Sequence, residues 1–194
     1  MMQQYLRHRF LFEELVKRDF KKKYKRTVLG MAWSLLLPLL MLLVMKLVFT
    51  QFFGRTMEHY TIYLFCGNLV FSYFNESTSQ GMTSLVNNAA IFTKVNIPKY
   101  LFLFSKNVQT LINFSLTLCI FFVFCAFDRI LFTWKFLLLL YPVCLLVLFN
   151  IGVGLILSAL YVFFRDIQYL WGVLTTIWMY LTPIFYPVSA LPEG

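Results

Sequence analysis

The sequence predicts an all-α, polytopic membrane protein, with about five transmembrane helices behind a basic amphipathic helix. Hydrophobic residues make up 60% of the 194-residue chain and charged residues only 13%, which is far from the composition of a soluble domain. The apolar residues also form long uninterrupted blocks, as membrane-crossing helices require. Nine cations precede the first block: Arg7, Arg9, Lys17, Arg18, Lys21, Lys22, Lys23, Lys25 and Arg26.

Residues 1–27 are expected to form an amphipathic helix at the cytoplasmic membrane surface. Apolar side chains recur among the cations at roughly helical spacing, so one face can enter the interface while the cations meet lipid headgroups. Asp19 lies within this basic cluster and is interpreted as an intrahelical salt-bridge partner rather than a catalytic acid. Topology and anionic lipids explain the net charge of +9, so no nucleic-acid partner is expected.

The transmembrane part is expected to fill residues 28–194. Spans are predicted near 28–49, 60–85, 108–127, 136–164 and 167–187. Polar residues and Pro98 predict a cytoplasmic loop at 86–106, since a proline breaks a helix that enters it. Pro183 and Pro187 predict a helix that ends near Leu181, with the chain after Thr182 bent near the outer surface.

The distribution of cations supports a cytoplasmic N-terminus. The nine N-terminal cations are joined on the predicted inner side by Lys94, Lys99, Lys106 and Arg165, which makes thirteen. Only three, Arg55, Arg129 and Lys135, fall on the predicted outer side. Lys and Arg beside transmembrane helices remain in the cytoplasm, so this excess fixes the predicted orientation.

A small set of polar and aromatic side chains within the spans are candidates for a substrate path. Exposure of the Glu76 carboxyl group to lipid would cost free energy, so this side chain should face a subunit interface or a water-filled path. A structural hydrogen-bonding role is favoured over a proton relay, because the predicted spans contain no second carboxylate. Aromatic rings near the far end of the last stretch offer flat faces to sugars. The candidates are Glu76, Trp178, Tyr180, Phe185 and Tyr186.

Four segments carry a family resemblance. Residues 15–40 match the pattern R-D-x-K-x-x-Y-x-x-T-x-L-G-x-x-W, followed by a proline inside the first span, through Arg18, Asp19, Lys21, Tyr24, Thr27, Leu29, Gly30, Trp33 and Pro38. The others, in order, are IFTKVNIPKYLF at 91–102, YVFFRDIQYLW at 161–171 and YLTPIFYPVSALPE at 180–193. Together they resemble the type-two ABC exporter permeases that move lipid-linked polysaccharides, such as O-antigen and teichoic-acid export permeases.

The resemblance implies a homodimeric permease of the bacterial cytoplasmic (inner) membrane that exports a lipid-linked polysaccharide: O-antigen of lipopolysaccharide, capsule or teichoic acid. It also implies a separate ABC ATPase subunit, which binds ATP and magnesium and receives a coupling helix from the loop at 86–106. The candidate ATPase contacts are Arg18, Asp19, Lys94, Pro98, Lys99, Arg165 and Asp166. A sixth span is expected from the family and is absent from these residues, so residues 1–194 alone are not expected to export polymer.

Other functions remain open from the residues alone. An ABC-type drug or small-molecule exporter permease would use the same scaffold. An ion-coupled secondary transporter would require intramembrane acid pairs and matching repeat halves. A membrane-bound transferase would require His, Asp or Glu clustered at one face. No GxxxxGK[ST] loop occurs, so we expect no catalytic residue, cofactor or metal on this chain, and ATP hydrolysis on a partner.

Overall fold

The computed structural model describes residues 11–19, 21, 27–53, 59–92, 98–130 and 133–186, and these ranges contain helices and turns without any strand. Residues 11–19 form a first helix. The later elements are η1 (Gly30–Ala32), α2 (Trp33–Phe53), α3 (Tyr60–Asn87), α4 (Ala89–Phe92), α5 (Tyr100–Phe127), η2 (Trp134–Leu139), α6 (Leu140–Phe163) and α7 (Ile167–Leu181). The predicted all-α fold class is confirmed.

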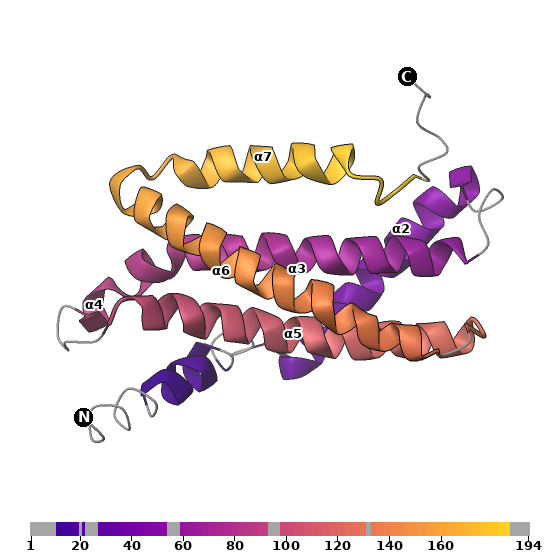
Figure 1. Ribbon diagram of the computed structural model, residues 1–194, viewed down its shortest axis with the longest axis horizontal. Helices are drawn as coiled ribbons and strands as arrows, with labels where there is room; N and C mark the ends of the chain where they lie inside the picture. The colour runs from indigo at the N-terminus through magenta and orange to yellow at the C-terminus, as the bar shows by residue number, and fades with distance from the viewer. Residues whose placement is uncertain are drawn as a thin grey trace.

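Three long helices, α3, α5 and α6, lie side by side at the centre of the fold (Figure 1). α2 packs on α3 and α5, and α7 lies against α3 and α6. The core between α3 and α5 is aromatic: the ring of Phe65 meets those of Phe121 and Phe124 edge-on, each at a centroid distance of 5.8 Å. Such edge-to-face pairs fix the relative positions of the helices that carry them.

The outside of the bundle is apolar. Tyr100–Phe127 and Phe136–Phe163 are long and apolar enough to cross a membrane, and Trp33–Phe49 is a shorter apolar helix. Large hydrophobic side chains are exposed along α2, α6 and α7. An apolar surface of this extent indicates contact with lipid or with a protein partner. α3 equals α5 in length but is more polar in its second half.

The segment expected to be a loop at 86–106 is mostly helical. α3 continues to Asn87, α4 occupies Ala89–Phe92 and α5 already begins at Tyr100. Pro98 stands just before α5, where its missing N–H costs no hydrogen bond within the helix. A proline that interrupts one helix can therefore precede another, which the sequence interpretation overlooked. As a result Lys106 lies inside α5, whereas Lys94 lies outside the described residues.

The chain bends after α7, as the two prolines near its end predict. α7 ends at Leu181, and the following turn packs against the start of α3. The hydroxyl of Tyr60 donates a hydrogen bond of 2.5 Å to the carbonyl of Phe185. Ile184 and Phe185 are buried there with Leu64. The rest of the predicted bend, after residue 186, lies outside the described residues.

Candidate functional site

The segments that the sequence assigns to the cytoplasm lie at one end of the bundle. Helix 11–19, α4 with the start of α5, and the turn from α6 to α7 all lie on the left in Figure 1. We call this the basic end. The start of α3 and the end of α5 meet at the opposite end, where His59 Nδ1 lies 2.6 Å from Asp128 Oδ2. The two ends therefore separate the segments in the way that the predicted topology requires.

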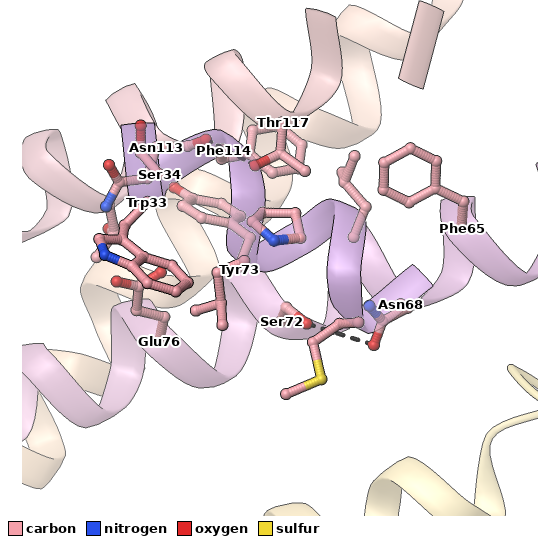
Figure 2. A pocket seen from close by; sticks show the side chains of 15 residues that line it. Trp33, Ser34, Phe65, Asn68, Ser72, Tyr73, Glu76, Asn113, Phe114 and Thr117 are labelled. Carbon is pink, nitrogen blue, oxygen red and sulfur yellow. Dashed lines mark hydrogen bonds between the residues drawn. The ribbon is translucent and has the colours of Figure 1, made fainter. Parts of the chain in front are cut away.

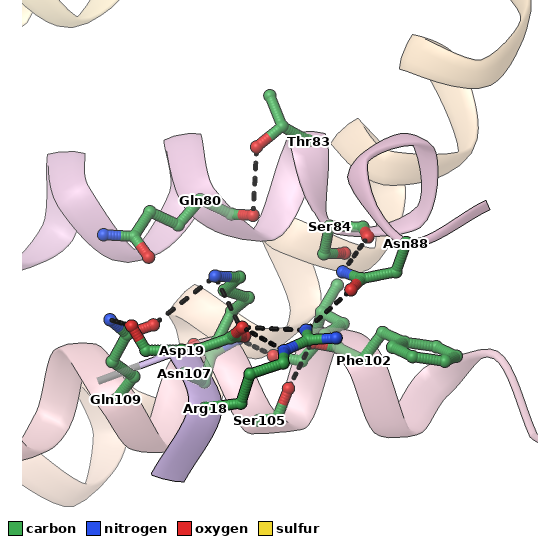
Figure 3. A network of polar contacts seen from close by, with 12 residues as sticks. Arg18, Asp19, Gln80, Thr83, Ser84, Asn88, Phe102, Ser105, Asn107 and Gln109 are labelled. Atoms are coloured by element: carbon green, nitrogen blue, oxygen red, sulfur yellow. Dashed lines mark hydrogen bonds and ion pairs between the residues drawn. The ribbon is translucent and has the colours of Figure 1, made fainter. Parts of the chain in front are cut away.

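An ion pair with a buried carboxylate and a partly buried lysine joins helix 11–19 to α5 at the basic end (Figure 3). Asp19 is only 4% exposed. Its Oδ1 accepts hydrogen bonds from Nε and Nη2 of Arg18 at 3.0 and 2.8 Å, and its Oδ2 lies 2.9 Å from Nζ of Lys106. The sequence predicted an intrahelical salt bridge for Asp19. The structure shows that its second cation comes from another helix, which sequence spacing cannot reveal.

The polar contacts around this ion pair extend to α3. Arg18 Nη2 donates to Oδ1 of Asn88, the residue that caps α3, at 2.7 Å. Nε2 of Gln109 donates to the main-chain carbonyl of Asp19 at 3.1 Å. The network thus connects three helices, and we call its members the clamp: Arg18, Asp19, Asn88, Lys106 and Gln109.

The other predicted contact residues at the basic end lie on its surface. Pro98 is partly exposed and Lys99 is exposed where α5 begins. Arg165 and Asp166 are exposed in the turn between α6 and α7, with the guanidinium carbon of Arg165 5.0 Å from the ring centroid of Tyr161. These side chains are accessible to a partner, in contrast to the buried carboxylate of Asp19.

A cavity of about 220 Å³ lies between α2, α3 and α5 (Figure 2). Trp33 and Glu76 lie at one end of it and Phe65 at the other. Glu76 Oε1 accepts a hydrogen bond of 2.8 Å from Nε2 of Gln80, one turn further along α3. Hydroxyls, amides and aromatic rings make up much of the remaining lining: Ser34, Asn68, Ser72, Tyr73, Thr110, Asn113, Phe114 and Thr117.

The four aromatic candidates lie elsewhere, along α7 and the turn after it. Trp178 is exposed, and its ring meets Phe74 of α3 at a centroid distance of 5.3 Å. Phe185 is 5% exposed and stacks on Phe49 at 5.0 Å. The hydroxyl of Tyr186 donates to the carbonyl of Tyr180 at 2.9 Å. Glu76 and these rings therefore do not line one common cavity, and Phe185 and Tyr186 help to hold the turn.

Comparison with known families decides the class of this helical bundle. The profile described as "ABC-2 type transporter" matches residues 11–194. The chain belongs to the ABC-2 type transporter family. The match includes both the clamp and the turn after α7.

Similar proteins agree with this assignment. The O-antigen export system permease protein RfbA of Myxococcus xanthus is 30% identical over the whole of this chain, which corresponds to 74% of the relative's length. Two proteins of the same name from Klebsiella pneumoniae are 28% identical over 95% of this chain and 73% of theirs.

Membership of the ABC-2 family decides between the functions that the sequence alone left open. A protein of this family is a transport subunit, so neither the transferase nor the ion-coupled secondary transporter is favoured. The resemblance to type-two ABC exporter permeases, drawn from four short segments, is confirmed.

Sequence reasoning missed several residues of this ABC-2 bundle. Lys106 was counted only among the cytoplasmic cations, and Asn88 and Gln109 of the clamp were not named as candidates. A signal for buried polar contacts was present, because Asn107, Thr110 and Asn113 recur at a spacing of three within the apolar α5. All three are buried, which is the arrangement expected of polar side chains at a helix–helix contact within a membrane.

Proposed function

We propose that this ABC-2 protein is the membrane permease subunit of an exporter of lipid-linked polysaccharide of the O-antigen type. A separate ATPase subunit, which binds ATP and magnesium, supplies the energy. The relatives named O-antigen export permeases support the cargo. The observation that best supports a separate ATPase is the basic end. Three chain segments lie together there and could form one surface for a partner: helix 11–19, α4 with the start of α5, and the turn from α6 to α7 (Figure 1).

In this proposal the basic end faces the cytoplasm of the bacterium. That end contains Lys17 and Arg18 on helix 11–19, Lys99 just before α5 and Arg165 in the turn from α6 to α7, whereas Asp128 and Arg129 follow the end of α5 at the other. Cations remain on the side where the chain is made. We therefore propose that the bundle lies in the cytoplasmic membrane with its N-terminus inside.

Cysteine labelling from either side of the membrane tests this orientation. With the natural cysteines replaced, Lys99→Cys and Arg165→Cys should react only with reagents that reach the cytoplasm. Asp128→Cys should react from the outside. Labelling of position 99 from the outside alone would reverse the proposed orientation.

The ATPase is proposed to bind the exposed part of the basic end. Lys99, Arg165 and Asp166 are exposed charges there, with Pro98 beside the first, and Arg18 is partly exposed nearby. Lys94 is also proposed as an ATPase contact, on the basis of the sequence alone. Surface charges of this kind steer and orient a partner more than they add affinity.

The substrate path is proposed to follow exposed faces of the bundle in a homodimer. Trp178 and Tyr180 keep exposed rings on α7, and exposed apolar side chains surround them. A second copy would cover part of this surface and leave the rings beside the polymer. Glu76 borders a separate cavity between α2, α3 and α5, which polar and apolar side chains line together.

Deletion of the gene in the bacterium that encodes the permease tests the function. We expect surface polysaccharide to disappear and lipid-linked polysaccharide to accumulate at the cytoplasmic face. The wild-type gene should restore the surface polymer. Unchanged surface polysaccharide in the deletion strain would contradict the proposed cargo.

A further inference from the structure

We infer that Asp19 is a positioning residue whose buried carboxylate locks helix 11–19 to α5, so that this helix, α5 and the end of α3 move as one body during transport. The inference rests on the proposed function, because the ATPase supplies the force that the joint transmits. It gives Asp19 an internal task, distinct from direct contact with the ATPase.

The burial of the ion pair is the first argument. The side chain of Asp19 is 3% exposed and that of Lys106 is 18% exposed, at a distance of 2.9 Å. A charge removed from water is stable only while its partners stay beside it. Separation of the two helices would leave Lys106 without its carboxylate, and Asp19 with Arg18 as its only cation. The surface pair of Lys17 and Glu14 differs: it is 3.6 Å long, with side chains 63% and 53% exposed. Such a pair constrains little.

The second argument is that adjacent residues of helix 11–19 bind different helices. Asp19 is held by α5 through Lys106 and through the Gln109 amide on its main-chain carbonyl. Arg18 reaches the cap of α3 through Asn88. The guanidinium of Arg18 lies at the C-terminal end of α3, where the helix dipole favours positive charge. Helix 11–19 is thereby fixed to two helices at once.

An apolar contact one turn away completes the joint. Leu15 is four residues before Asp19 and therefore lies on the same helical face. It is buried against Phe102 of α5, together with Leu11, Leu101 and Ile91 of α4. α4 and helix 11–19 thus meet the first turn of α5, next to the exposed Lys99. A displacement applied there by a partner would move all of these elements together.

A removable tether tests whether this joint is required. Asp19→Cys and Lys106→Cys are introduced together into the genomic copy, with the natural cysteines replaced. Without a cross-linker, we expect the permease to retain its ATPase and the ATP hydrolysis, while export falls by about tenfold or more because the helices are no longer locked. A short bifunctional thiol reagent that joins the two positions should restore export to within about threefold of the parent.

A matched surface pair serves as the control. Glu14→Cys with Lys17→Cys removes the exposed ion pair on the same helix and should leave export unchanged, with or without the reagent. Normal export by the unlinked Asp19→Cys/Lys106→Cys permease would overturn the inference. So would a tether that blocks export or fails to restore it, because the helix would then have to leave α5 during the cycle.

Single substitutions cover the possibility that the double variant does not accumulate. Lys106→Arg keeps the charge and should export normally, whereas Lys106→Met should lose export but retain ATP hydrolysis. Equal export by both would also overturn the inference. Failure of the proposed function is distinguishable, since the unsubstituted permease would then itself show no export and no bound ATPase.

Discussion

Gly81 of α3 and Gly154 of α6 lie face to face: a Cβ atom placed on Gly81 would be 3.3 Å from the Cα of Gly154. Small residues let two membrane helices approach until their backbones are in contact. Next to this contact, Met82 of α3 packs with Leu157 and Tyr161 of α6. The two glycines therefore help to set the distance between the helices that frame the basic end.

Substitution of Gly81 should show the importance of this approach. Gly81→Ala forces α3 and α6 apart, and we expect the permease to lose about 1–3 kcal/mol of stability from overpacking. Gly152→Ala is the matched control on α6, because a Cβ there meets no atom within 4 Å. The control should instead gain up to about 1 kcal/mol from helix propensity. Thermal unfolding of the detergent-purified proteins measures both, and equal unfolding temperatures would contradict the contact.

Gly67 should control the turn after α7. A Cβ on Gly67 would lie 3.0 Å from Cγ2 of Ile184 and 3.5 Å from its Cα and Cβ, two atoms that a cysteine at position 184 retains. Gly67→Leu should therefore push the turn away from α3 and expose position 184. In a background without natural cysteines, the thiol of Ile184→Cys should then react about tenfold faster. Gly172→Leu is the control, since its position on α7 is open; a similar acceleration there would contradict the assigned contact.

Glu76 should act through hydrogen bonding. Glu76→Gln keeps an oxygen that can accept from Gln80, so export should stay within about twofold of the parent. Glu76→Leu removes the acceptor from the partly buried amide and should cost about 1–3 kcal/mol of stability. Export is followed as surface polysaccharide in the cell. If Glu76→Gln abolishes export while folding normally, a proton relay would replace the structural role.

Lys99 should contribute to ATPase binding. Lys99→Glu reverses an exposed charge at the basic end, and we expect the rate at which the permease associates with the ATPase, or the export per ATP hydrolysed, to fall about tenfold. Pro98→Ala should act in the same direction by loosening the entry to α5. Arg129→Glu reverses a charge at the opposite end and should have no effect on ATPase binding. Equal loss in both charge-reversal variants would show that net charge, and not location, matters.

Much of the fold could be predicted because long apolar blocks and prolines are local signals. The apolar blocks located the long helices, and the prolines after Thr182 indicated the bend. The region from Val86 to Lys106 was interpreted less well, because polar residues that face a helix–helix contact look like a loop in sequence. Asn88 and Lys106 are satisfied by Arg18 and Asp19 from a distant segment. Whether such a segment forms a helix or a loop depends on its tertiary partners and not on its local composition.

The candidate site was predictable only in part for the same reason. Lys99 and Arg165 were named as candidates because charges stand out beside apolar spans. The first stands just before α5 and the second in the turn from α6 to α7, and both segments lie at the basic end. The clamp depends on side chains that meet across three helices, so no spacing rule could combine them. The aromatic candidates were grouped by sequence, whereas packing buries Phe185 and leaves Trp178 exposed.

The most direct test of the central claim is ATP-driven transfer of lipid-linked polysaccharide in proteoliposomes. The permease is purified from its own membrane with its ATPase, and again after the ATPase has been removed. We predict transfer only when both proteins and ATP are present, and neither binding nor hydrolysis of ATP by the permease alone. Hydrolysis by the permease alone, or transfer driven by an ion gradient without ATP, would contradict the account.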